Sequence, residues 1–365
     1  MRAVALGGGH GLHATLSALR ALVDRGIVDE RITAVVTVAD DGGSSGRLRR
    51  ELGLLPPGDL RMAIAALAAD DAAGSLWRTL VQHRFGGTGA LAGHAVGNLL
   101  LAGLMETLGD PVTALDEVGA LLGVRGRVLP MSREPLDIEA DVTGLGAPGE
   151  VHRIRGQVAV ASTPGRVQRV RLLPGEPDAC ADALAAVREA DVLLLGPGSW
   201  FTSVLPHLLV PQLRAAVVGS AARRVVVLNL APEPGETAGF SPEQHLAVLS
   251  QHAPELRVDA VLADIAAVSV PERLRRAARG MLASGGDVHL APVAASDRAV
   301  PRHDPAALAT ALEAVLDALD ALDALDTSRR GLMAEPDPEP GAIPARRPHD
   351  PAVPAAGGDA AERRW

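Results

Sequence analysis

Short apolar runs alternate with longer segments in which apolar residues recur at helical spacing. The first run, RAVAL (2–6), leads through glycines into LHATLSALRALVD, which has helical periodicity. Residues 31–39 form a continuous apolar run typical of buried strands in parallel sheets, and 191–210 repeats the order strand, glycine loop, helix. Residues 223–237 give another buried strand that ends in a loop. Further strands are expected at 258–264 and 286–293. This order predicts an α/β fold, a Rossmann-like and mostly parallel sheet with helices on both faces.

Two regions depart from this pattern. Between about residues 124 and 175, apolar and polar residues alternate and turn residues separate the runs, which predicts a β-rich insertion of antiparallel hairpins. From Thr327 the chain is rich in Pro, Ala, Gly and Arg without apolar periodicity. We therefore expect a single domain over 1–326, whose last segment is the low-complexity helix end at 316–326, and a disordered tail over 327–365.

Composition narrows the class of protein. A net charge of −9 and only three Trp, three Phe and no Tyr argue against nucleic acid as a partner. No apolar run is long enough for a membrane span, and the N-terminus breaks into glycines too early for a signal peptide, so a cytoplasmic protein is expected. The single cysteine, Cys180, is interpreted as a buried filler. All 35 basic residues are arginine, which excludes a P-loop lysine and a pyridoxal phosphate site.

The glycines that follow the first strand form the first candidate site. Gly7, Gly8, Gly9 and Gly11, with His10 among them, lie where a helix begins, and bare amides at a helix N-terminus bind anions. A tight turn is the alternative, but adjacent glycines exceed what a turn needs. The dinucleotide fingerprint is absent because its third glycine position holds Leu12, so NAD is not expected as a cofactor.

The second candidate is the segment VTVADDGGSSGRLRR (36–50). Asp40 and Asp41 follow an apolar strand and precede small residues and arginines. Carboxylates, hydroxyls and amides together can hold Mg²⁺ and a diphosphate, so Asp40 and Asp41 are predicted metal ligands. The alternative is an aspartate helix cap with solvated neighbours.

Five further motifs carry polar groups that suit a ligand. PPGDLR (56–61) presents Asp59 and Arg61, with a helix cap as the alternative role of Asp59. GHAVGNLL places His94 and Asn98 four residues apart, on one face of a predicted helix. In the second glycine loop, GPGSWFTSVLPH, hydroxyls follow the glycines at a helix start. The last two are APEPGET (231–237) and RHDP (302–305).

These motifs together resemble the YvcK-like gluconeogenesis factors, which share a superfamily with the 2-phospho-L-lactate transferases of deazaflavin coenzyme synthesis. The similarity covers residues 2–305, rests on GGGHGL, VTVADDGGSSGRLR, PPGDLR, GHAVGNL and GPGSWFTS in this order, and is greatest to the actinobacterial branch. It implies a cytoplasmic protein that binds a UDP-sugar such as UDP-N-acetylglucosamine. It also implies a role in peptidoglycan synthesis, cell shape and growth on gluconeogenic carbon sources. Cell-wall regulatory proteins or kinases are the implied protein partners, and a homo-oligomer is expected.

The residues predicted to bind the nucleotide sugar come from the motifs above. They are Gly8, Gly9, His10, Gly11, Asp40, Gly43, Ser44, Ser45, Arg47, His94, Asn98, Gly196, Gly198, Ser199, Thr202, His207 and Arg302. Binding without turnover is the favoured hypothesis, because no general base is evident. A Mg²⁺-dependent transferase that moves a phosphoryl-containing group from a nucleotide diphosphate donor is the alternative, and a dehydrogenase is the least favoured.

Overall fold

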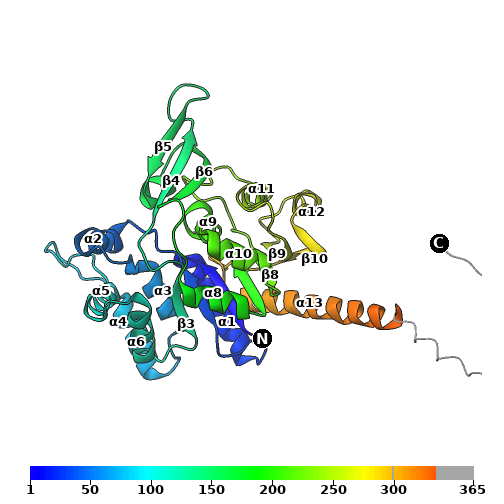
Figure 1. The fold of residues 1–365 in the computed structure, drawn as a ribbon, viewed down its shortest axis with the longest axis horizontal. Coiled ribbons are helices and arrows are strands. Elements are labelled where there is room, and N and C mark those ends of the chain that lie inside the picture. Colours follow the sequence, from blue (N-terminus) through cyan, green and yellow to red (C-terminus); the bar gives the residue numbers. More distant parts are fainter. Residues whose placement is uncertain (298–299, 334–365) are drawn as a thin grey trace, which may run out of the picture. The chain divides into compact units, whose positions relative to one another are not determined.

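The computed structural model describes residues 1–297 and 300–333, and its centre is a seven-stranded parallel sheet (Figure 1). The strand order is β10-β9-β8-β7-β1-β2-β3, and every neighbouring pair runs parallel. The strands are β1 (Ala3–Gly7), β2 (Thr33–Val36), β3 (Arg127–Pro130), β7 (Val192–Leu195), β8 (Arg223–Val227), β9 (Val258–Asp264) and β10 (Leu282–Ala291). The predicted α/β class is confirmed.

The chain builds this sheet outward from its middle in two directions. From β1 it proceeds to β2 and β3 on one side, and from β7 it proceeds to β8, β9 and β10 on the other. Because parallel crossovers are right-handed, the two directions place their helices on opposite faces. The first group is α1 (Gly9–Asp24), α2 (Gly43–Leu52), α3 (Pro57–Leu67), α4 (Ala72–Gln82), α5 (Val96–Leu108) and α6 (Pro111–Leu121). The second is α9 (Pro206–Leu209), α10 (Pro211–Gly219), α11 (Pro242–His252) and α12 (Pro271–Ala278), and α8 (Ala181–Glu189) packs on α10.

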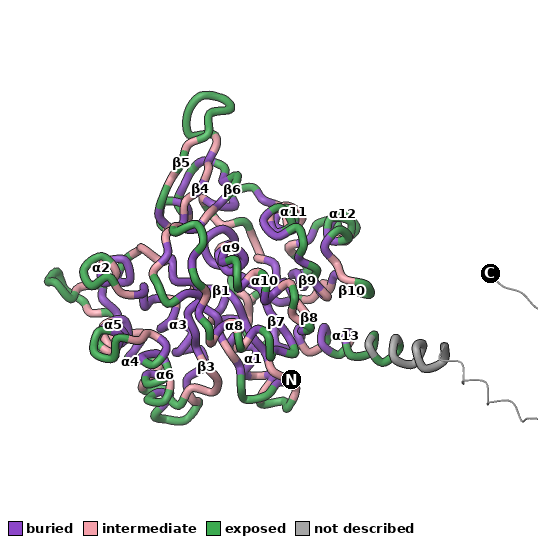
Figure 2. Tube along the Cα trace, in the orientation of Figure 1, coloured by how far each residue is buried: buried purple, intermediate pink, exposed green. Residues whose placement is uncertain are grey.

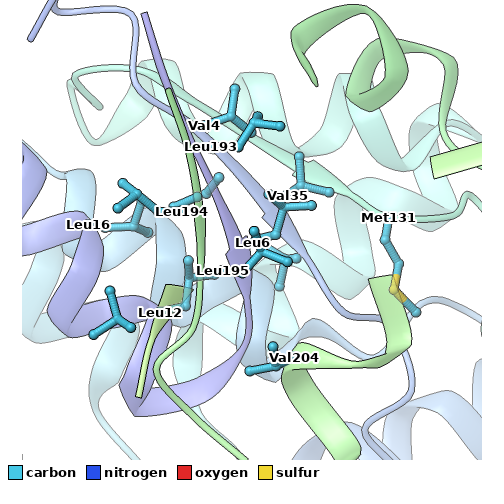
Figure 3. Packing of buried hydrophobic residues seen from close by; sticks show 14 of the residues in the cluster. Val4, Leu6, Leu12, Leu16, Val35, Met131, Leu193, Leu194, Leu195 and Val204 are labelled. Atoms are coloured by element: carbon cyan, nitrogen blue, oxygen red, sulfur yellow. The ribbon is translucent and has the colours of Figure 1, made fainter. Parts of the chain in front are cut away.

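The core is made of the apolar runs that predicted the strands. All residues of β1 and β7 are buried, and in Figure 3 leucines of β7 lie beside residues of β1 and α1. Figure 2 shows that burial is concentrated in these central strands, whereas the turn that joins β4 to β5 is exposed. Because both faces of the sheet are covered, its strands carry no polar alternation.

Helix starts follow the expected local chemistry. Ser241 and Gln244 form a capping box at the start of α11, and Pro242 occupies its first position. Two other starts differ from the prediction. Helix α2 begins at Gly43 rather than at the arginines, and α5 begins at Val96, so His94 precedes that helix and is not on its face.

The β-rich insertion is smaller than predicted. It consists of β4 (Asp137–Thr143), β5 (Val151–Arg155) and β6 (Arg166–Leu173), in the order β5-β4-β6, with the short helix α7 (Gln157–Ala161) after β5. The run RGRVLPM was wrongly assigned to it, because β3 pairs with β2 in the main sheet. The predicted strand HRIRGQVAVAS also breaks at Gly156, where φ is +105° and the chain turns into α7.

The last described element is helix α13 (Pro305–Met333). It continues past Thr327, where the tail was predicted to begin, and residues 334–365 of that tail lie outside the described residues. Met1–Leu322 form one compact unit that contains both sheets, and the chain from Asp323 forms a second. Among the described residues, no helix combines the length and the apolar character that a membrane crossing requires.

Candidate functional site

The candidate site lies where β1 and β7 are neighbours in the sheet. The chain leaves these two strands in opposite directions, so their carboxyl ends flank a topological switch point, the usual ligand crevice of an open α/β sheet. The loop after β1 carries Gly8, Gly9 and Gly11, and the loop after β7 carries Gly196 and Gly198. The two predicted glycine motifs are therefore brought together.

The two loops touch through their backbones. A Cβ atom on Gly11 would lie 2.1 Å from the carbonyl oxygen of Pro197 and 2.7 Å from the Cα of Gly198. Asn229, which follows β8, fixes the second loop: its Oδ1 accepts the N–H of Gly198 at 2.9 Å and its Nδ2 donates to the Gly198 carbonyl at 2.9 Å. Only glycine at position 11 permits this approach.

A polar cavity of about 240 Å³ opens beside the contact. Its lining residues are Gly8, Gly9, His10, Gly11, Thr37, Asp40, Asp59, Gln157, Gly198, Ser199, Thr202, Ser203 and Glu233. Helix α1 begins here without a side-chain cap, and helix geometry leaves its first N–H groups without an intrahelical acceptor. The Thr37 side chain is buried, and no hydrogen-bond partner is found for its Oγ1 within the described part of the chain. The cavity thus offers amide and hydroxyl donors to an anion.

Two carboxyl groups face these donors. Burial raises the pKa of Asp59 to about 7, with the Asp40 charge as the second cause, although the Gly9 N–H and Arg61 act in the opposite direction. Burial also raises the pKa of Asp40, whose Oδ1 accepts the Gly42 N–H at 2.9 Å. Asp59 is therefore partly protonated near neutral pH.

A third carboxyl group closes the cavity on the side of the second loop. Glu233 accepts a hydrogen bond of 2.7 Å from the Ser199 hydroxyl. Its neighbour Glu236 is buried and accepts the Phe201 N–H at 3.3 Å. Burial, followed by the Glu233 charge, raises the pKa of Glu236. Trp200 and Phe201 are fully buried, and the Trp200 indole donates to the His245 carbonyl at 3.0 Å, so the segment after Ser199 is anchored in the core.

A larger cavity of about 590 Å³ adjoins the polar one and shares four lining residues with it. The shared residues are His10, Gly11, Gly198 and Glu233. Its other walls are mainly the segments 229–234 and 300–305, which bring Arg302, His303 and Asn229 to the cavity. Burial lowers the pKa of His303 to about 4, so this ring is neutral at physiological pH. The two cavities form one site with a polar and a larger, less polar compartment.

Several predicted residues form a buried network behind the polar cavity instead of lining it. The Ser44 hydroxyl accepts from Asn98 Nδ2 at 3.0 Å and lies 2.9 Å from His94 Nδ1, to which it can donate. Arg61 Nε donates to Asn98 Oδ1 at 2.8 Å, and Arg47 donates to the Ala92 carbonyl at 2.8 Å. This network holds α2, α3 and α5 together. Ser45 lines neither cavity and instead forms a hydrogen bond to Asp40.

Other predicted residues also lie outside both cavities. His207 is fully buried, with Nε2 3.0 Å from the Val35 carbonyl and Nδ1 3.3 Å from the Val204 carbonyl. The lining of neither cavity includes Gly43, Gly196 or Asp41. The Asp41 carboxylate instead accepts the Val158 N–H at 2.9 Å. The carboxyl partner of Asp40 at the cavity is therefore Asp59, not Asp41.

Sequence reasoning missed Thr37, Asn229 and Gln157, and it singled out the motif APEPGET without assigning Glu233 to the site. A signal existed for the first two, because each is a polar residue within an apolar run. Gln157 carried none, since its segment was interpreted as a strand. In the described residues, no group of three or more His, Cys, Asp and Glu side chains is placed to hold a metal ion, so a cation here would need further ligands from phosphate or water.

Comparison with known proteins places this site in a family. The model of the family described as 2-phospho-L-lactate transferase CofD matches residues 3–294. A Mycobacterium tuberculosis (strain H37Rv) protein, provisionally named a gluconeogenesis factor, is 60% identical over 318 residues, 86% of this chain and 89% of that protein. The Bacillus subtilis (strain 168) gluconeogenesis factor is 38% identical over 270 residues, 74% of this chain and 80% of that protein. The crystal structure of a UPF0052-family protein from Bacillus halodurans matches with a TM-score of 0.73 and 33% identity, covering 86% of this chain and 98% of that one.

Proposed function

This chain belongs to the 2-phospho-L-lactate transferase CofD family, among its gluconeogenesis factors, and we propose that it binds a nucleotide sugar of the UDP-N-acetylglucosamine class. The proposed role is that of a cytoplasmic regulatory protein which supports cell-wall synthesis and cell shape during growth on gluconeogenic carbon sources. One observation carries the binding proposal: two glycine loops meet at the switch point of the sheet, beside an uncapped helix start.

The polar compartment suits the diphosphate. The N-terminal amides of α1 and the hydroxyls of Thr37 and Thr202 line the same 240 Å³ space. Such groups form short hydrogen bonds to phosphate oxygens, and the dipole of the 16-residue helix α1 favours negative charge at this end. No lysine is needed for this arrangement.

The larger compartment suits the nucleoside. Its volume of about 590 Å³ is within the range of small-molecule sites, and prolines and other apolar residues of segments 229–234 and 300–305 provide apolar walls. Asn229 and Glu233 supply hydrogen-bonding groups for a ribose or a base edge, and Arg302, which lines the larger cavity, supplies a charge for the diphosphate.

Mg²⁺ fits this proposal through Asp40 and Asp59. Both carboxyl groups face the polar cavity, and Mg²⁺ prefers one or two carboxylates together with phosphate oxygens and water. A bound cation would favour the ionised form of Asp59 and offset the repulsion between these carboxylates and a diphosphate. Asp41 does not line this cavity, because its carboxylate accepts the Val158 N–H.

Transfer of a phosphoryl-containing group is the second candidate function. The family match and the paired acidic groups at the anion site favour it, because such transfers depend on positioning and on stabilisation of charge. The decisive difference from the first candidate is turnover, not binding.

The experiment is a calorimetric titration with UDP-N-acetylglucosamine, with and without Mg²⁺, followed by incubation with hydroxy acid acceptors. Saturable binding without release of nucleotide supports the regulatory role, whereas acceptor-dependent release of a nucleoside monophosphate supports the transferase.

Arg302→Gln should weaken binding about tenfold, the effect of losing a charged hydrogen bond. Arg273→Gln, an exposed arginine on α12 outside both cavities, is the matched control and should bind as wild type does. No saturable binding to the wild-type protein would refute the proposal.

A further inference from the structure

Asp41 is adjacent to a cavity residue but serves a different element. Its Oδ1 accepts the Val158 N–H at 2.9 Å, and this N–H belongs to the first turn of α7. Its Oδ2 lies so close to Gly156 that a Cβ atom there would be 2.4 Å away. The carboxylate therefore holds the point at which the chain leaves β5 and turns into α7.

Helix α7 carries one residue of the polar cavity. Gln157, its first residue, lines that cavity, and it is the only lining residue contributed by the insertion in the described chain. The rest of the short helix is well anchored. Val160 is fully buried, and the Gly156 N–H donates to the Ile138 carbonyl of β4 at 2.8 Å. The position of the Gln157 side chain thus depends on how α7 begins.

A second contact joins the same two regions. Arg49 of α2 and Arg155 of β5 both pair with Asp137 of β4, the latter with an Nε to Oδ2 distance of 2.9 Å. The segment from Asp41 to α2 is therefore tied to the insertion at both its ends. Asp137 has two arginine partners and would hold the sheet near α2 even without the Asp41 contact, but it does not fix the start of α7.

We infer that Asp41 is a positioning residue: by accepting the Val158 N–H it fixes the start of α7, so that the Gln157 amide faces the ligand in the polar cavity. This inference rests on the proposed nucleotide-sugar binding. It makes the insertion a part of the binding site. The insertion contributes a neutral amide to a cavity whose other polar side chains are hydroxyls, carboxyls and the imidazole of His10. A side-chain amide can donate to a phosphate or a sugar hydroxyl and also accept from the latter.

The test is a double-mutant cycle on the affinity for UDP-N-acetylglucosamine. Gln157→Ala should weaken binding about fivefold, the usual effect of one lost hydrogen bond. Asp41→Ala should weaken it by a similar factor, and the double variant should bind no more weakly than either single one, because Asp41 acts through Gln157. Asp41→Asn retains an oxygen acceptor and should restore most of the affinity. Hydrogen exchange at Val158 and Val160 should be faster in Asp41→Ala than in wild type.

The matched control is Asp71→Ala. Asp71 caps α4 by accepting the Gly74 N–H at 2.7 Å and lines neither cavity, so its loss should lower stability without changing the affinity. If Asp41→Ala binds as wild type does, or if the two single effects add, the inference is wrong while the proposed function stands. If the wild-type protein does not bind at all, both fail. Should Asp41→Ala not fold, Asp41→Asn is compared directly with wild type, and a loss of affinity as large as that of Gln157→Ala would refute the inference, because the asparagine oxygen can still accept the Val158 N–H.

Discussion

Asp59 allows the electrostatics of the site to be tested without any ligand. Its pKa lies at about 7 instead of 3.8, chiefly because it is buried and secondly because Asp40 is close. The folded protein therefore holds a proton on Asp59 at pH values where the unfolded chain has lost it. At low pH both the folded and the unfolded chain are protonated at Asp59, so the group does not alter the free energy of unfolding. As the pH rises from about 4 to 7 the free energy of unfolding falls, and above pH 7 the full penalty of the buried charge is present.

The size of the effect follows from the shift. A rise of about three pKa units corresponds to about 4 kcal/mol between the two protonation states. Part of the Asp59 surface remains exposed to solvent, which screens its charge and reduces this figure. We therefore expect Asp59→Asn to stabilise the protein by about 2 kcal/mol at pH 8. At pH 4 the two proteins should be equally stable, because the asparagine amide keeps an oxygen acceptor for the Gly9 N–H and carries no charge.

Urea denaturation at pH 4, 6 and 8 measures this difference. Only the variant minus wild-type difference is used, since other groups also titrate in this range. Asp317→Asn, an exposed carboxylate on α13, is the control and should show no difference that grows with pH. If Asp59→Asn is less stable than wild type at pH 8, or if its stability changes with pH as that of wild type does, the account of the buried carboxyl pair is wrong.

The remaining predictions concern the two glycine loops and the cation. Gly11→Ala should destabilise the protein by about 1–3 kcal/mol in urea unfolding, because its Cβ would meet the Pro197 carbonyl at 2.1 Å. The control is Gly103→Ala, at an open position within α5, which should instead stabilise the protein by about 0.5–1 kcal/mol. Asn229→Ala should lower stability by about 1–3 kcal/mol and weaken nucleotide-sugar binding in calorimetry, since the Gly198 backbone loses two hydrogen bonds. Without Mg²⁺, affinity for UDP-N-acetylglucosamine should fall as the pH rises through 7, and added Mg²⁺ should reduce that dependence. A metal-free affinity that is constant from pH 6 to 8 would contradict the last of these.

The features that could be predicted from the sequence are those with local causes. Buried parallel strands such as β1 and β7 need continuous apolar runs, and both runs are plain in the sequence. The two glycine loops were predictable for a similar reason: glycine has no side chain, so bare amides between a strand and a helix are visible in the order of residues alone. Their meeting at one site then followed from the rule that parallel strands present their carboxyl ends at the same edge.

The features that could not be predicted depend on contacts between distant segments. Asp40 and Asp41 are adjacent and chemically identical, but Asp40 lines the cavity. Asp41 instead accepts the N–H of Val158, which is 117 residues further along the chain. The run that contains α7 has strand-like alternation, and it turns into a helix because Gly156 bends the chain against Asp41. Likewise, His207 looked like a ligand because it follows the second glycine loop, whereas tertiary packing buries it against two carbonyl oxygens.

The charges of the site separate the two candidate functions more sharply than its shape does. Asp40, Asp59 and Glu233 surround amide donors that would otherwise attract a diphosphate, so the cavity opposes its own ligand unless a proton or a cation is present. A protein that only senses a nucleotide sugar needs the donors but gains nothing from three acidic groups. A protein that transfers a phosphoryl-containing group needs a cation, and acidic side chains such as these three can hold it. Replacing Asp40 by Asn tests this argument: metal-free binding should become tighter, and a transferase should in addition lose the acceptor-dependent turnover that the wild-type protein shows.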